Sequence, residues 1–140
     1  MDIQVTFPGG KQVNAKVGDF VIETDQPKDL GGEGLFPAPF ELFLASMATC
    51  AGIYALGFCQ ARKLPTEGLA LVQRQEYDPA GKRLVKVTLE LTLPAGFPET
   101  HRAAIVRAIE NCKVKKAIAE APVFEVAVTN PPVVVAQPSV

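Results

Sequence analysis

The sequence has a single histidine, His101, and no Cys-x-x-Cys motif among its three cysteines. A structural zinc site needs about four ligands, mostly cysteine and histidine, so this composition argues against a metal site. The odd number of cysteines also argues against a disulfide framework. Cys50, Cys59 and Cys112 are therefore expected to be either core residues or reactive thiols, and we expect neither a metal nor a cofactor.

An excess of basic residues is also missing, because the formal net charge is -1. Nucleic acids and anionic membranes usually require a basic face, so neither is expected as the main partner. The N-terminus has no basic stretch followed by an apolar run, and no window of about 18 uninterrupted apolar residues occurs. We therefore expect no signal peptide, no membrane span and a cytoplasmic location.

The chain does contain enough apolar material for one core, with 48% hydrophobic and 21% charged residues over 140 positions. Residues 3–7, 13–17 and 20–22 predict three short strands separated by turns. Residues 25–34 are rich in glycine, proline and aspartate and predict an exposed loop. We expect one domain over residues 1–130 and a C-terminal tail over residues 131–140.

The most distinctive segment runs from about residue 39 to residue 63 and carries few charges except at its ends. It is too long for a strand and apolar nearly all round, a pattern typical of a helix buried on most of its faces. Glu41 lies in the first turn, where a carboxylate suits the helix dipole, and Pro65 ends the helix. A chain this short is not expected to cover such a helix alone, which favours a dimer.

Residues 69–77 and 83–93 predict a β-hairpin, and the alternation of apolar residues in its second strand indicates one buried face. After a helical region, residues 124–128 alternate again and predict a last strand. The expected order is β-β-β-α-β-β-α-α-β, which is an α+β fold.

Cys112 has the sequence position that most favours a thiolate. The period becomes helical from residue 99, with Thr100 as a possible N-cap, and Asn111 can cap a second short helix in which Cys112 is the first helical residue. Unpaired backbone N–H groups would then face its sulfur, and lysines at positions 113, 115 and 116 add positive charge. The alternative is a core residue beside a solvated basic face.

Cys50 and Cys59 lie within the long predicted helix in apolar surroundings. Each is more simply a core residue when taken alone, because free cysteine is often buried and burial raises the pKa of a thiol. They are nine residues apart, so they lie on opposite sides of a helix. A reactive Cys50 would need a nearby cation or oriented donors, whereas Cys59 is expected in the core.

Two segments resemble the motifs of the OsmC/Ohr family. Residues 39–51, Pro-Phe-Glu-Leu-Phe-Leu-Ala-Ser-Met-Ala-Thr-Cys-Ala, resemble the family's helix, in which a Pro-x-Glu-Leu-like start leads to small residues and Ala-Cys. Residues 111–118, Asn-Cys-Lys-Val-Lys-Lys-Ala-Ile, resemble its second motif, Cys-Pro-Val followed by basic and apolar residues. The separation of 62 residues between Cys50 and Cys112 and the element order are also similar.

The resemblance implies an OsmC-like fold, with antiparallel sheets around a long central buried helix, in an intertwined homodimer. It implies that Cys50 attacks a peroxide, that Cys112 condenses with the resulting sulfenic acid, and that an external dithiol resets the disulfide. Glu41 would be the catalytic glutamate. Apolar walls around Cys50 would favour organic hydroperoxides over hydrogen peroxide.

The activating residues depart from the family pattern. The family pairs its thiolate with an arginine from the N-terminal strands, but no arginine precedes Arg62, which leaves Lys11 and Lys16 as candidates. Glu41 is shifted by one residue from the family position, about 100° around a helix. Lys113 stands where the family has proline.

Three functions therefore stay open. The first is a thiol peroxidase that reduces organic hydroperoxides. The second is an OsmC-like protein that binds an apolar small molecule without turnover. The third is a redox sensor that forms a reversible disulfide between Cys50 and Cys112.

Overall fold

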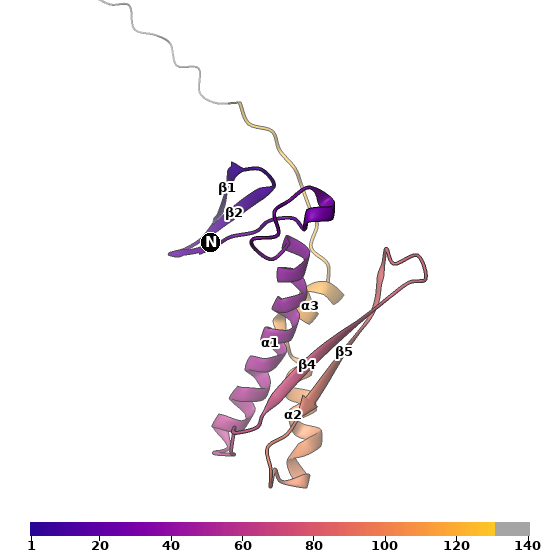
Figure 1. The fold of residues 1–140 in the computed structure, drawn as a ribbon. Helices are drawn as coiled ribbons and strands as arrows, with labels where there is room; N and C mark the ends of the chain where they lie inside the picture. Colours follow the sequence, from indigo (N-terminus) through magenta and orange to yellow (C-terminus); the bar gives the residue numbers. More distant parts are fainter. Residues whose placement is uncertain (131–140) are drawn as a thin grey trace, which may run out of the picture.

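The computed structural model describes residues 1–130, and the predicted tail, residues 131–140, lies outside this part. Three strands are followed by a long helix, a hairpin and two short helices (Figure 1), so the predicted α+β class is confirmed. The bounds are β1 Ile3–Gly9, β2 Gln12–Val17, β3 Phe20–Ile22, α1 Pro39–Ala61, β4 Ala70–Tyr77, β5 Leu84–Thr92, α2 Arg102–Glu110 and α3 Lys113–Ala119, with 3-10 turns η1 Lys28–Leu30 and η2 Glu99–His101.

The first three strands form an antiparallel sheet in the order β1-β2-β3, as the alternation predicts. Gly10 and Gly18 adopt positive φ angles of 57° and 59° in the two connecting turns, a conformation that glycine reaches without steric cost. The sheet lies beyond the N-terminal end of α1 (Figure 1). Every residue of β1 is exposed, so one chain leaves this strand uncovered on both faces.

The predicted exposed loop is organised around a buried carboxylate, which corrects the expectation for its first residue. Asp25 is 1% exposed and accepts backbone N–H bonds from Gln26 at 2.7 Å, Glu33 at 3.1 Å and Leu35 at 3.2 Å. A Cβ on Gly32 would lie 1.9 Å from the carbonyl oxygen of Gln26, so only glycine fits there. The loop therefore has one defined conformation between the sheet and α1.

Helix α1 begins with Pro39 at its first position, where a fixed φ angle favours the helix and no N–H is lost. The Glu41 carboxylate accepts the backbone N–H of Ala38 at 2.8 Å and so caps this end. The predicted bounds are confirmed to within two residues. The predicted burial on most faces is not reached within one chain, where only five of its 23 residues are buried: Met47, Ala51, Ala55, Phe58 and Cys59.

By length and composition alone, α1 is also apolar enough to cross a membrane. The same test is passed by core helices of globular proteins, so it does not decide between the two. About a quarter of the most apolar stretch, 28%, is buried within the chain. The remaining apolar surface of α1 needs another cover.

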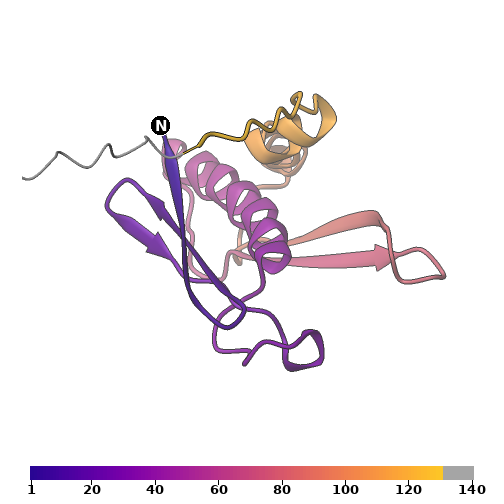
Figure 2. The same cartoon turned by 90° about the horizontal axis from the view of Figure 1, so that it is seen from above.

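The hairpin is confirmed, with β4 antiparallel to β5 from the pair Ala70–Thr92 onward. The Asp78 carboxylate accepts the backbone N–H groups of Lys82 at 2.8 Å and Arg83 at 3.2 Å, which closes the turn. One face of the hairpin lies along α1, and the turn projects away from the helices (Figures 1 and 2).

Two predicted helix caps are wrong. Thr100 lies within η2, and α2 begins at Arg102 directly after it. Asn111 ends α2, where its side-chain Nδ2 donates to the carbonyl of Arg107 at 3.1 Å. The N-cap of α3 is Cys112 itself, because its backbone is not helical and the helix begins at the next residue.

The predicted last strand, residues 124–128, is absent from the described part of the chain. A strand needs an edge to pair with, and no strand of the same chain pairs with this segment. Its apolar side chains are exposed instead: Phe124, Val126 and Val128.

The core lies where α1, α2 and the hairpin meet. The small residues Ala51 and Ala55 let α2 approach α1, and Ile105 and Ile109 fill the space between them. Cys59 is fully buried in the same cluster, as predicted. This core fixes α1 and α2 and, through the short α2–α3 connection, the position of Cys112.

Candidate thiol site

Cys50 lies in the middle of α1 and is half-buried, whereas Cys112 is fully buried at the start of α3. The two thiols lie close enough for each to shift the pKa of the other, although the residues are 62 positions apart in the sequence. All three cysteines are free thiols. The packing of α3 on α1 thus brings together the two cysteines that the sequence singled out.

The pKa of Cys50 is held below its ordinary value. Partial burial raises it, but the hydrogen bond from Cys112, the backbone N–H groups of Val114 and Lys113, and the Lys113 charge together outweigh that effect. Oriented donors and a cation are the conditions that favour a thiolate. The structure therefore supplies what an otherwise apolar Cys50 needs to react.

Of the two interpretations left open for Cys112, the structure favours the buried core residue. Burial raises the pKa of Cys112, as do the hydrogen bond and charge of Cys50, although the N–H groups of Lys115 and Val114 act against this. The N–H groups of Val114 and Lys113, at the start of α3, also favour the thiolate of Cys50. The two thiols thus divide into a more acidic, accessible one and a less acidic, buried one.

Cys59 does not belong to this site. Burial alone raises the pKa of its thiol, and it lies in the core on the opposite side of α1 from Cys50. This agrees with the prediction of a core residue.

Glu41 lies nine residues before Cys50, about 13 Å along the helix axis, and its carboxylate is exposed. It caps α1 through the N–H of Ala38. Within one chain it is therefore not brought to Cys50. Lys11 is in the turn between β1 and β2 and Lys16 is on β2, whereas the cation that acts on Cys50 is Lys113. The sequence had indicated that the lysines at positions 113, 115 and 116 add positive charge near Cys112, not near Cys50.

Two cavities flank the thiol along α1, although Cys50 itself lines neither. The first has a volume of about 410 Å³ and a mostly apolar wall between α1, the hairpin and α3. Met47 lines it and lies three residues before Cys50, on the same face of α1. Leu89 on β5 and Ile118 on α3 also line this cavity.

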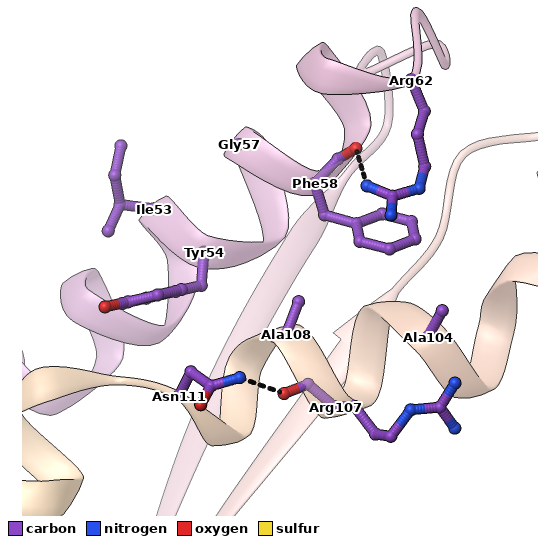
Figure 3. A pocket seen from close by; sticks show the side chains of 9 residues that line it. All are labelled: Ile53, Tyr54, Gly57, Phe58, Arg62, Ala104, Arg107, Ala108 and Asn111. Carbon is purple, nitrogen blue, oxygen red and sulfur yellow. Dashed lines mark hydrogen bonds between the residues drawn. The ribbon is translucent and has the colours of Figure 1, made fainter.

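The second cavity, of about 510 Å³, is a groove between α1 and α2 (Figure 3). Tyr54 lines it four residues after Cys50, and its ring points along α1 away from Arg62. Asn111, next to Cys112, lines the same end. The sequence analysis missed Tyr54, whose i, i+4 spacing from Cys50 was the available signal.

Known structures share this architecture. A protein of Psychrobacter arcticus assigned to osmotic stress induction and detoxification response is 21% identical with a TM-score of 0.66, covering 82% of this chain and 85% of its own. An organic hydroperoxide resistance protein OsmC of Legionella pneumophila is 21% identical with a TM-score of 0.54, covering 84% and 89%.

A protein of Vibrio cholerae assigned to organic hydroperoxide resistance, with captopril bound in one of its active sites, is 20% identical. Its TM-score is 0.55, with 84% of each chain covered. At these identities the likeness shows the fold. None of the curated proteins matches the chain in sequence.

The sequence model of the family described as OsmC-like protein matches residues 32–127, a span that contains α1, the hairpin, both cysteines of the site and α3. Membership of this family implies a role related to stress or peroxides. With more than half of its length matched and the fold shared with OsmC and Ohr structures, this chain belongs to the OsmC-like protein family.

Proposed function

We propose that this protein reduces organic hydroperoxides, with Cys50 as the peroxidatic thiol and Cys112 as the resolving thiol. The observation that carries the proposal is the position of the half-buried Cys50, whose pKa is lowered, beside the buried thiol of Cys112. A thiolate is the nucleophile in such chemistry, and a neighbouring thiol traps the product.

In the first step the Cys50 thiolate attacks the terminal oxygen of the hydroperoxide. An S–O bond forms, the O–O bond breaks, and the alkoxide leaves as the alcohol after taking up a proton. In the second step the Cys112 sulfur attacks the sulfenic sulfur, an S–S bond forms and water leaves. An external dithiol then reduces the disulfide and is itself oxidised to a disulfide.

The preference for organic over hydrogen peroxide rests on the apolar cavity beside Cys50. Met47, Leu89 and Ile118 offer hydrocarbon surface to a substrate side chain, and a cavity of about 410 Å³ accepts a ligand of moderate size. Hydrogen peroxide has no apolar group that could use this surface.

In this proposal Lys113 is the cation that activates the Cys50 thiol. Its charge and its backbone N–H both act on Cys50, and proline at this position would supply neither. Glu41 would join the site only from a second copy of the chain, since its own Cys50 is too far away.

We also propose that the protein acts as a homodimer. Helix α1 leaves Phe40 and Phe43 exposed, and the segment around Phe124 presents alternating apolar side chains without a strand partner. A second copy can cover the helix and offer strand edges to this segment. We further propose a cytoplasmic location, where thiols are kept reduced.

The proposal is tested by following cumene hydroperoxide with excess dithiothreitol. Turnover should fall roughly a thousandfold or more in Cys50→Ser, because no other thiol here is both accessible and acidified. In Cys112→Ser, dimedone should trap a sulfenic acid on Cys50, whereas the wild type forms the disulfide. Cys59→Ser is the matched control and should keep its turnover.

Wild-type protein that consumes no peroxide while Cys50 stays reduced would contradict the proposal and favour a binding protein. Stoichiometric formation of the disulfide without turnover would favour the redox sensor.

A further inference from the structure

The groove between α1 and α2 has a composition that the thiol chemistry does not explain. Its floor is made of residues with little or no side chain, namely Gly57, Ala104 and Ala108 (Figure 3). Tyr54 lies at one end, and the guanidinium groups of Arg62 and Arg107 extend toward the other end in this view. The result is an open trough of about 510 Å³ with an aromatic end and a cationic end.

Arg62 is held in place before any ligand arrives. Its Cζ lies 3.9 Å from the centroid of the Phe58 ring, and its Nη1 donates to the Phe58 carbonyl at 3.5 Å. A cation stacked on an aromatic face has already lost much of its side-chain freedom. The guanidinium keeps further N–H donors that these contacts do not use.

Arg107 carries a second positive charge on the facing helix. Within residues 1–130, the three ion pairs join Arg74 to Glu90, Lys86 to Glu76 and Arg102 to Glu99. Neither groove arginine is paired with a carboxylate there, and Glu110, three residues after Arg107, does not form an ion pair with it. The groove therefore presents two uncompensated guanidinium groups.

We propose that this groove binds a small organic anion, with its carboxylate at Arg62 and Arg107 and its flat body over Gly57 and the two alanines. Arginine suits this role because its planar fork matches a carboxylate. The small residues leave room for a ring to lie flat, and the Tyr54 ring closes the far end. The volume falls within the range of about 300 to 1,000 Å³ usual for ligand sites.

The test uses naphthoate and its uncharged isostere naphthamide, titrated into the reduced full-length protein by calorimetry. Naphthoate should bind about tenfold more tightly than naphthamide, the ratio expected for a charge-assisted hydrogen bond. Binding should also weaken as salt increases. The assay reads binding alone, so it can be repeated in Cys50→Ser, and its result is separate from that of the peroxidase assay.

Arg107→Gln should weaken naphthoate binding by about five- to tenfold and leave naphthamide unchanged. Gly57→Leu, which fills the floor without changing charge, should abolish binding of both. Arg83→Gln removes an exposed arginine from the hairpin turn and is the matched control, with unchanged binding expected.

Equal affinity for the acid and the amide, or an equal loss in Arg83→Gln, would overturn the proposal. A further result would also overturn the proposal, namely wild-type protein that binds no naphthoate together with loss of self-association in Arg107→Gln. The groove would then be a contact between chains.

Discussion

At the scale of single residues, the three cysteines differ in how much thiolate each carries at a given pH. The pKa of Cys50 is lowered, whereas burial raises those of Cys59 and Cys112. A lower pKa means that the thiolate appears at lower pH, so iodoacetamide should label Cys50 first as the pH rises from about 5 to about 10. Peptide mass spectrometry of the labelled protein reads each site separately. Labelling of Cys112 before Cys50 would contradict the assignment.

The contribution of Lys113 can be separated from that of its neighbours. Lys113→Met removes the charge but keeps the backbone N–H, so it should slow Cys50 labelling near pH 7 by roughly two- to fivefold, as expected for a partly screened charge. Lys115→Met is the matched control on the same helix, since only the backbone of Lys115 acts at this site. Equal slowing in both variants would show a general effect of net charge.

The sequence could indicate which cysteines matter but not which of the two is acidic. Spacing and resemblance singled out Cys50 and Cys112. The direction of each shift depends on how deeply each thiol is buried and on which N–H groups at the start of α3 reach it. Caps are the least predictable part of a helix, because several polar residues near its start can fill the position.

At the scale of elements, the loop before α1 depends on Asp25. Burial raises the pKa of this carboxyl. Backbone N–H bonds, chiefly from Gln26 and Leu35, lower the pKa by more than burial raises it, so the net shift is downward. A lowered pKa stabilises the fold above the unfolded-state value of about 3.9, and this stabilisation is lost as the pH falls through the folded value.

Asp25→Asn should therefore lower the melting temperature at neutral pH, and the difference from wild type should shrink below about pH 4. Thermal unfolding followed by circular dichroism at several pH values checks this. Asp29→Asn in the same loop is the control, since these three backbone N–H groups donate to Asp25 and not to Asp29. A difference that stays constant down to about pH 2 would contradict the linkage.

The elements with a strong period were predictable, because α1, the hairpin and the N-terminal sheet each repeat their pattern over many residues. The Asp25 loop was not, since its N–H donors lie eight and ten positions further along the chain. The strand at residues 124–128 has the right alternation but no edge to pair with in one chain. The local sequence pattern therefore predicts a tendency to form a strand, and the strand forms only where another strand offers an edge for pairing.

At the scale of the whole molecule, the chain exposes more surface than a compact monomer. It exposes 11019 Å², whereas a compact protein of 14.9 kDa exposes about 7,000 Å². An ordinary interface covers about 800 Å² of each partner, so the exposed surface leaves enough area for a second copy to cover.

If a second copy covers α1, stability must depend on protein concentration, because dimer formation stabilises the folded chain by mass action. Phe40 is the residue to change, since it stacks on Phe43 at a centroid distance of 5.6 Å and both rings are exposed on the apolar helix. A charge there costs little in a monomer but would be buried in a dimer without a partner, at a cost of several kcal/mol.

Phe40→Lys should therefore shift sedimentation equilibrium from dimer to monomer and remove the concentration dependence of the melting temperature. Val85→Lys, at a similarly exposed apolar position on the hairpin, is the control and should stay dimeric. A wild type that sediments as a monomer would refute the dimer, and with it any contribution of Glu41 to Cys50. In that case the activation of Cys50 would come from its own chain alone, from the Cys112 thiol, Lys113 and the α3 backbone, and Lys113→Met should also lower the peroxidase activity.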